Sequence, residues 1–170
     1  IGQKQLPAGW KWVKLGDVCD VRDGTHDTPK YVAEGIPLIT SKNLKPYGLD
    51  FDNTQNISYD DYVQISKRSE VDIGDVLYGM IGTIGNPVLV DTDKQFAIKN
   101  MALFKFSNNS LNSKFFFYGI QSPLVTQQIT ASTQGGIQNF VSLKVLRTLD
   151  FPLPPLGEQK RIAGILNEQM

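Results

Sequence analysis

Hydrophobic and polar residues recur along the chain with two different periods, which together predict strands and helices. Short apolar runs over residues 36–44 and 96–106 are typical of strands, and two runs within residues 75–91 flank a glycine-containing turn, as in a hairpin. Residues 58–71 begin with a serine and two acidic residues and carry Lys67 near their end, which is the charge order of a capped helix. The first half of the chain is therefore expected to combine strands with a short surface helix.

The second half of the chain predicts more helix. Residues 115–122 and 124–129 are expected to form two short helices, with the aromatic run of the first in the core. Residues 141–154 predict one helical turn and then a strand that prolines terminate. The fold class is therefore α/β of the α+β type. We expect a mixed, mostly antiparallel sheet domain with short peripheral helices over residues 1–155, and an outgoing C-terminal helix over residues 156–170.

This outgoing helix has an apolar stripe at helical spacing. A helix of about three turns is marginal in water by itself, so the stripe is expected to be covered by a partner helix. The residues assigned to this partner or dimer helix are Gln159, Ile162, Ile165 and Leu166.

The composition fits one globular domain. The chain has 170 residues, 41% of them hydrophobic and 20% charged, and no apolar run approaches the roughly 18 residues of a membrane span. The first residues contain neither a basic nor an apolar signal region, which favours a cytoplasmic protein without a membrane partner. Cys19 is the only cysteine, so neither an internal disulfide nor a cysteine-based zinc site is expected.

The formal net charge is zero, but the charge is distributed unevenly. Residues 1–93 carry 14 acidic and 9 basic side chains, whereas residues 94–170 carry 3 acidic and 8 basic ones. This asymmetry would allow one basic face to meet the phosphates of a nucleic acid. Solvated charge without any partner explains it equally well.

Candidate catalytic groups are few. His26 is the only histidine, and Asp23 and Asp27 are too close to it in sequence to orient it as in a Ser-His-Asp triad. One histidine and one distant cysteine have poor spacing for a metal site. Residues 82–85 match neither a phosphate-binding loop nor a dinucleotide fingerprint. We therefore expect a protein that is not an enzyme and has no metal or cofactor of its own.

Five motifs follow one another along nearly the whole chain. They are LPAGWKWVKLGDV, DGTHDTPKY, IPLITSKNL, GDVLYGMIGTIG and TQGGIQNFVSLKVLRTLDFPLPPLGEQKRIAGIL. Because it carries these five motifs in this order, the chain resembles one half of the DNA-specificity subunit of type I restriction-modification systems. Each motif alone is weak, and their shared order and spacing carry the resemblance.

The resemblance implies a target recognition domain that reads one half of a split site in double-stranded DNA, followed by the start of a spacer helix. It implies methyltransferase subunits and a restriction subunit as partners, and places the methyl donor, ATP and magnesium on them. The chain fits either a fragment of a two-domain subunit or a half-length subunit that forms a homodimer through its C-terminal helix. The alternatives are a protein-interaction adaptor that uses this helix and the recognition domain of a fused type II restriction-methylation enzyme.

Side chains suited to DNA are concentrated in the predicted loops. Polar and amide side chains read base edges, whereas lysines on phosphates supply affinity and register. Lys42 and Lys45 are expected on phosphates, and amides such as Gln138 can bond adenine in a bidentate way. Turn capping and plain solvation are the competing interpretations. The full set assigned to DNA binding is Thr25, His26, Thr28, Lys30, Ser41, Lys42, Lys45, Thr83, Lys99, Asn100, Gln134 and Gln138.

Overall fold

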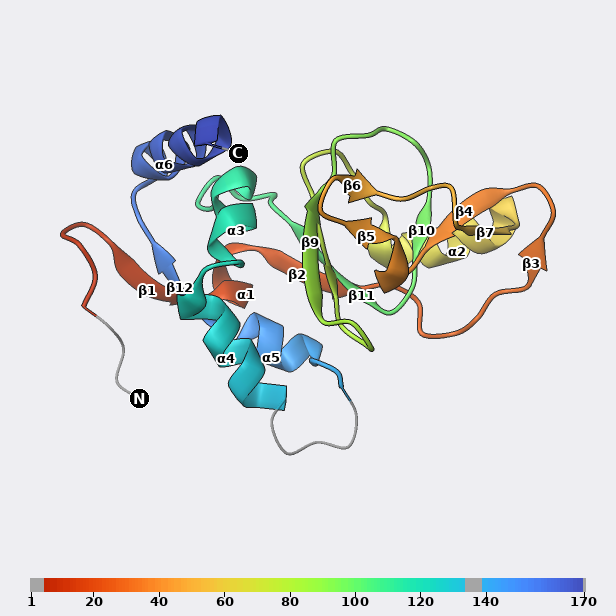
Figure 1. The fold of residues 1–170 in the computed structure, drawn as a ribbon, viewed down its shortest axis with the longest axis horizontal. Helices are drawn as coiled ribbons and strands as arrows, with labels where there is room; N and C mark the ends of the chain where they lie inside the picture. Colours follow the sequence, from red (N-terminus) through yellow and green to blue (C-terminus); the bar gives the residue numbers. More distant parts are fainter. Residues whose placement is uncertain (1–4, 134–138, 170) are drawn as a thin grey trace.

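The computed structural model of the protein describes residues 5–133 and 139–169, and two four-stranded sheets lie at its centre (Figure 1). The first sheet has the order β2-β11-β8-β9, with antiparallel pairings throughout. Its strands are β2 (Asp20–Asp23), β8 (Val76–Gly79), β9 (Gly85–Leu89) and β11 (Met101–Lys105). The second sheet has the order β10-β4-β7-β3, in which β10 and β4 are parallel and the other pairs antiparallel. Its strands are β3 (Tyr31–Val32), β4 (Ile36–Ile39), β7 (Gln55–Ile57) and β10 (Ala97–Ile98).

Two short strand pairs complete the sheet structure. Strand β1 (Lys11–Lys14) pairs with β12 (Asp150–Leu153), and β5 (Leu44–Lys45) pairs with β6 (Gly48–Leu49), both antiparallel. The β1–β12 pair joins the two ends of the domain, because Lys11 lies opposite Leu153. The expected mixed, mostly antiparallel sheet domain is therefore confirmed.

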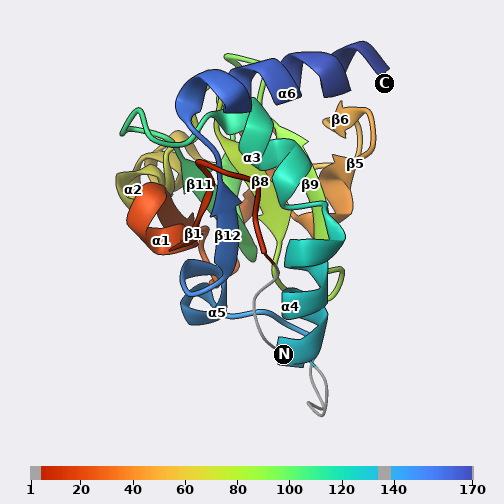
Figure 2. The ribbon, with the colours of Figure 1, turned by 90° about the vertical axis from the view of Figure 1, so that its left-hand side faces the viewer.

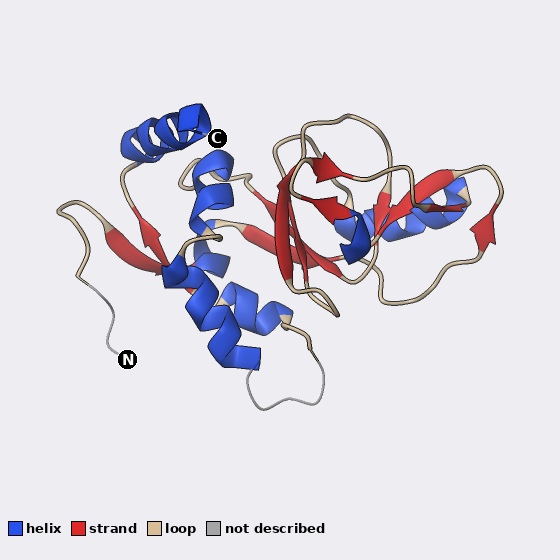
Figure 3. Cartoon of the chain, viewed as in Figure 1, coloured by secondary structure: helices blue, strands red, loops and turns tan. Residues whose placement is uncertain are grey.

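The helices, drawn in blue in Figure 3, are short except for α2, α4 and α6. Most of them lie in the second half of the chain. They are α1 (Leu15–Val18), α2 (Tyr59–Ser69), α3 (Ser113–Gly119), α4 (Pro123–Thr133), α5 (Leu143–Arg147) and α6 (Leu156–Gln169), with a 3-10 helix η1 (Ser41–Asn43). The Ser58 hydroxyl caps α2 by accepting a hydrogen bond from the Asp61 backbone at 3.1 Å, as expected for residues 58–71. Ser142 caps α5 in the same way. Viewed from the side, α6 runs across the end of α3 (Figure 2).

The largest hydrophobic core lies between the first sheet and helices α1, α3, α4 and α5. Phe104 of β11, Phe116 of α3 and Phe151 of β12 stack at its centre, with ring centroids 4.7 Å apart for the first pair and 5.6 Å for Phe116 and Phe151. The expectation that the aromatic run is core is confirmed for Phe115 and Phe116, which are buried. A second cluster, which includes Leu77, lies between the two sheets, so β8 is buried on both faces.

Two expected strands are shorter than the sequence pattern indicated. The run over residues 36–44 leaves the sheet after Ile39 and turns into η1. The run over residues 96–106 is divided between β10 and β11, because Asn100 has a positive φ of 56°, which ends one strand and redirects the chain. Both interruptions place polar residues in loops next to the sheets.

Candidate nucleic-acid interface

Several connections that follow strands meet on one side of the domain, and we call this surface the loop edge. It comprises residues 23–30, 41–43, 81–85, 99–100 and 139–140. Thr25 pairs with Lys99, and Ile81 pairs with Phe140, each through an isolated β-bridge. The Ser41 hydroxyl donates a hydrogen bond to the Ile81 carbonyl at 3.5 Å. Segments far apart in sequence thus form one continuous surface, along the lower side of the ribbon in Figure 1.

The loop after β2 is fastened to the turn between β10 and β11. The Thr25 backbone N–H donates to the Ile98 carbonyl, and the Asn100 N–H donates to the Thr25 carbonyl, both at 3.0 Å. The Lys99 ammonium donates to the Thr28 hydroxyl at 2.6 Å. Gly24 has to be glycine here, because a Cβ on it would lie 2.3 Å from the Ile98 carbonyl oxygen. The backbone of this loop is therefore held before any ligand arrives.

His26 forms a second link between the same two segments. Its Nε2 lies 2.6 Å from Asp23 Oδ2, and its Nδ1 lies 3.0 Å from Asn100 Oδ1. Both partners are acceptors, so the ring bonds both of them only as a doubly protonated imidazolium. The Asp23 carboxylate, and then the Asn100 amide, accordingly raise the pKa of His26 above its ordinary value. Asp23 thus orients His26 despite its proximity in sequence, against our expectation, but the other ring nitrogen faces an amide and not a nucleophile.

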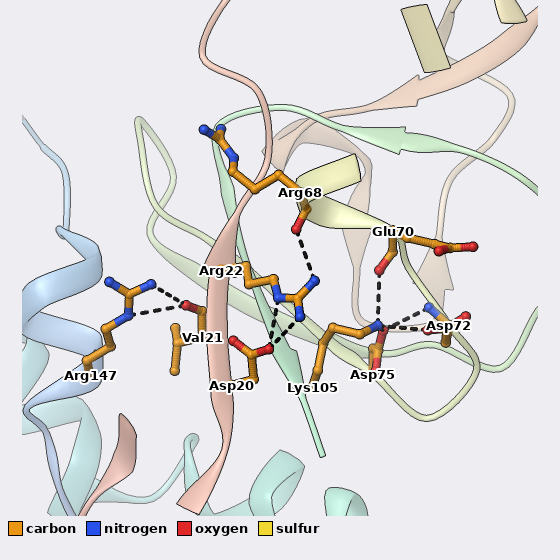
Figure 4. Close-up of polar contacts among 9 residues, drawn as sticks. All are labelled: Asp20, Val21, Arg22, Arg68, Glu70, Asp72, Asp75, Lys105 and Arg147. Atoms are coloured by element: carbon orange, nitrogen blue, oxygen red, sulfur yellow. Dashed lines mark hydrogen bonds and ion pairs between the residues drawn. The ribbon is translucent and has the colours of Figure 1, made fainter. Parts of the chain in front are cut away.

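Hydrogen bonds and ion pairs link this loop to the end of α2, and Figure 4 shows the part that joins α2 to β2. Arg68, in the last turn of α2, donates to the Gly24 carbonyl at 2.8 Å, and its Nε lies 3.5 Å from Asp23 Oδ1. Arg22 of β2 donates to the Arg68 carbonyl at 3.2 Å, while its guanidinium pairs with Asp20. The helix end is therefore bonded to both the strand and the loop.

Lys105 fixes the segment after α2 from within the first sheet. Its ammonium lies 2.5 Å from Asp75 Oδ2 and 2.9 Å from Asp72 Oδ2, and it also donates to the Glu70 carbonyl at 3.0 Å (Figure 4). Burial raises the pKa of the Asp75 carboxyl, although the hydrogen bond from Lys105 opposes that rise. On the other side of β2, Arg147 of α5 donates to the Val21 carbonyl at 2.7 Å. The Lys105 contacts fix the end of the first sheet opposite the loops, because Lys105 pairs with Asp20 whereas the loops follow Asp23 and Gly79.

A polar cleft of about 420 Å³ lies within the loop edge, between η1 and the turn at residues 99–100. Its lining residues are Tyr31, Leu38, Thr40, Ser41, Lys42, Asn43, Asn53, Gln55, Ile81, Lys99 and Asn100. The Asn43 side chain is buried and fixes η1, since its Oδ1 accepts from the Thr40 N–H at 2.9 Å and its Nδ2 donates to the Asp50 carbonyl at 3.1 Å. Lys42 is exposed beside it. The cleft presents hydroxyl, amide and ammonium groups, which suit phosphates and base edges.

The β8–β9 turn is bonded to the segment that leads into α5. The Gly82 N–H donates to the Asn139 carbonyl at 3.0 Å, and Asn139 Nδ2 donates back to the Gly82 carbonyl at 2.5 Å. Gly79 has to be small, because a Cβ on it would lie 2.3 Å from the Thr83 carbonyl oxygen. Thr83 itself is exposed at the turn. A hollow of about 620 Å³ separates this turn from α4.

The structure gathers most of the residues assigned to DNA binding on the loop edge. Those placed there are Thr25, His26, Thr28, Lys30, Ser41, Lys42, Thr83, Lys99 and Asn100. Lys45 lies apart from them in the β5–β6 pair, opposite Gly48. Gln134 and Gln138 lie outside the described residues.

Sequence reasoning missed several residues of the loop edge and of its support. Asn53 and Gln55 line the polar cleft, and Asp23 and Arg68 hold the loop after β2. Phe140 is exposed at the edge. The DGT sequence beginning at Asp23 could have indicated that a carboxylate opens the loop, whereas nothing local indicated that Arg68 reaches Gly24.

The C-terminal helix differs from expectation at Gln159. This side chain is fully buried, and its three hydrogen bonds stay within the chain. Its Oε1 accepts from the Asn112 N–H at 2.8 Å, and its Nε2 donates to the carbonyls of Ser110 and Pro154 at 2.9 Å each. Assigning Gln159 to a partner-binding face was therefore wrong, because its amide satisfies backbone groups of its own domain.

Some of the other apolar residues of α6 pack against the domain, and the rest face solvent. Ala163 is buried, and Ile162 packs against the main core. Ile165 is exposed, and Leu166 is half-buried. Only the outer part of the expected stripe is therefore open to a partner.

The described parts of the chain, residues 5–133 and 139–169, contain no group of three metal-ligating side chains. Within the same ranges, no helix is long and apolar enough to cross a bilayer.

The fold and the loop edge define a class: a mixed-sheet domain that presents a preorganised polar surface and continues into a helix. The chain matches the type I restriction modification DNA specificity domain over residues 7–168, and it belongs to that family. The family resemblance noted in the sequence is therefore confirmed.

Curated relatives and solved structures agree with this assignment. The chain is 24% identical over 166 residues to the type I restriction enzyme MjaVIII specificity subunit of Methanocaldococcus jannaschii, covering 94% of this chain and 39% of that protein. It is 23% identical to the putative MjaX specificity subunit of the same organism, covering 96% of this chain and 40% of that protein. The chain thus spans about two fifths of the length of these relatives.

Two solved structures establish the similarity of fold. The HsdS subunit of Thermoanaerobacter tengcongensis has a TM-score of 0.70 at 23% identity, over 97% of this chain and 38% of that one. A structure of complex assembly and conformational transition in a type I R-M system has a TM-score of 0.73 at 23% identity, over 97% of this chain and 39% of that one.

Proposed function

We propose that this chain is a target recognition domain that reads one half-site of double-stranded DNA within a type I restriction-modification complex. The observation that carries the proposal is the loop edge, where five separate segments of this chain are joined into one polar surface. The chain is also a member of the DNA specificity domain family. Preorganised loops favour specific binding, because less conformational entropy is lost when they meet the DNA. The acidic excess of residues 1–93 is partly consumed in the ion pairs of Asp20, Asp72 and Asp75.

The residues of the loop edge divide into three proposed roles. Lys42, exposed beside the polar cleft, is proposed to contact a phosphate. The loop after β2 is joined to the turn before β11 by the contacts of His26 with Asn100 and of Lys99 with Thr28. We propose that these contacts hold the loop in the conformation that reads bases. Thr25 and Thr83 remain proposed base or backbone contacts.

In this proposal the chain performs no chemistry itself. Methylation belongs to methyltransferase subunits, and cleavage belongs to a restriction subunit that joins through the complex. The methyl donor, ATP and magnesium are bound by those subunits. Because its ligand is the DNA of the cell, the proposed location is the cytoplasm. A second half-site is read either by a second recognition domain or by a second copy of the chain paired through α6.

Domain exchange tests the function. The full native subunit is expressed with its methyltransferase subunits in a host that lacks other methylation, and the methylated motif is obtained by methylome sequencing. Replacing residues 5–153 with the equivalent part of another specificity subunit should leave the spacing intact. It should change one half of the motif if a second recognition domain reads the other half, and both halves if a second copy of the chain does. A motif that is unchanged by the exchange would refute DNA reading by this domain and favour an adaptor that works through its helix.

A further inference from the structure

Two large apolar side chains are exposed in the middle of the otherwise polar loop edge. Ile81 is 40% exposed and Phe140 is 47% exposed, and together with Gly82 and Asn139 they line a shallow hollow. Ile81 also lines the polar cleft that contains Lys99. The apolar pair is therefore continuous with the proposed DNA surface.

The backbone holds this pair rigidly in place. Ile81 and Phe140 are antiparallel bridge partners, and flanking hydrogen bonds run from the Gly82 N–H to the Asn139 carbonyl and from the Val141 N–H to the Met80 carbonyl. Side chains alternate in direction along an extended chain. Met80 and Val141 point into the core, where they are 4% and 2% exposed, so Ile81 and Phe140 point outward together.

An apolar side chain on a DNA-reading surface needs an apolar group on a base edge to contact. In the major groove only thymine presents a methyl group, and side chains such as Phe discriminate it by apolar contact. The neighbouring Lys42, which is exposed, is the residue proposed above to contact a phosphate. Polar groups for base edges lie on the cleft side of Ile81, which leaves its other side, next to Phe140, for the methyl group.

We propose that Ile81 and Phe140 form a specificity contact for the 5-methyl group of a thymine in the major groove. The inference rests on the proposed function, since it requires DNA on the loop edge. It makes an A·T pair a fixed part of the half-site that this domain reads.

The test uses the assembled complex of the full specificity subunit with its methyltransferase subunits, and duplexes that carry the motif found by methylome sequencing. Each thymine of the half-site is replaced singly by deoxyuridine, which removes the methyl group and leaves every hydrogen-bonding group in place. At one position the affinity should fall about fourfold, the change that corresponds to losing about 0.8 kcal/mol for one buried methylene-sized group. In the Phe140→Ser and Ile81→Thr variants the same replacement should have no further effect.

A matched control is Ile73→Thr, which makes the same change as Ile81→Thr at an even more exposed apolar side chain outside the loop edge. It should leave both the affinity and the response to deoxyuridine unchanged. The inference fails if no thymine position responds, if the response persists in both variants, or if the half-site contains no A·T pair. If Phe140→Ser instead weakens assembly with the methyltransferase subunits while deoxyuridine has no effect, the pair is a protein contact and the inference is overturned. Failure of the proposed function is a different result: the wild-type complex would then show no preference for the motif.

Discussion

The buried amide of Gln159 allows a quantitative prediction about how the C-terminal helix is attached. Replacing Gln159 with Leu keeps a similar volume but removes three hydrogen bonds. It leaves the Pro154 carbonyl without its partner in a buried place, and the Asn112 N–H without its partner in a partly buried one. A net hydrogen bond contributes about 1 kcal/mol, and an unsatisfied buried group costs about 1–3 kcal/mol. The Ser110 carbonyl is more exposed and can bond water. We therefore expect a loss of about 3 kcal/mol in the free energy of unfolding.

Urea unfolding measures this loss. The tryptophans give a local signal, because the Trp10 ring packs edge-on against Phe115 of α3, with centroids 6.4 Å apart. The midpoint should fall while the slope of the transition stays the same. The matched control is Lys160→Leu, at an exposed position on the same helix, for which a change within about 0.5 kcal/mol is expected. If Gln159→Leu costs less than about 1 kcal/mol, the amide does not anchor α6 as described.

Three further predictions concern the charged groups. Lys105→Met leaves the buried Asp75 carboxylate without its cation, and should lower the free energy of unfolding by about 3 kcal/mol in urea titrations. Lys42→Ala should weaken binding of the complex to all DNA sequences alike, and should reduce the slope of log K against log salt by about one. His26 has a raised pKa in the folded state through Asp23, so its stabilising contribution is complete below the unfolded pKa of about 6.5 and disappears as the pH rises through the folded pKa. The stability difference between wild type and His26→Gln should therefore shrink on going from pH 6 to higher pH.

Each of these predictions has its own contradicting result. An unfolding midpoint of Lys105→Met equal to that of the wild type would show that the Lys105–Asp75 pair does not stabilise the fold. For Lys42 the control is Lys160→Ala on the exposed side of α6, and equal salt slopes for both variants would remove Lys42 from the phosphate contacts. A difference between wild type and His26→Gln that stays constant with pH would mean that the ring does not bond both acceptors in its charged form.

Local chemistry along the chain determined several elements of this protein. Helix α2 begins after Ser58, as expected, and α5 forms within the expected residues 141–154, after Ser142. Both starts depend on a cap, which is an interaction between a side chain and a backbone group three residues away. The β8–β9 hairpin also forms where predicted, around a turn in which Gly82 and Gly85 have positive φ. The order of family motifs was likewise readable without a structure.

Only the tertiary structure decided how the candidate site is assembled. Lys99 and Asn100 were assigned to DNA binding from the sequence, but their side chains bond Thr28 and His26, which are 71 and 74 residues away in sequence. Gln159 had the spacing of a helix face, yet the strand pair β1–β12 and the start of α3 bring backbone groups to it that bury its amide. Periodicity reports which face of an element is apolar. Which distant segment covers that face depends on strand register and packing, and these are properties of the whole fold.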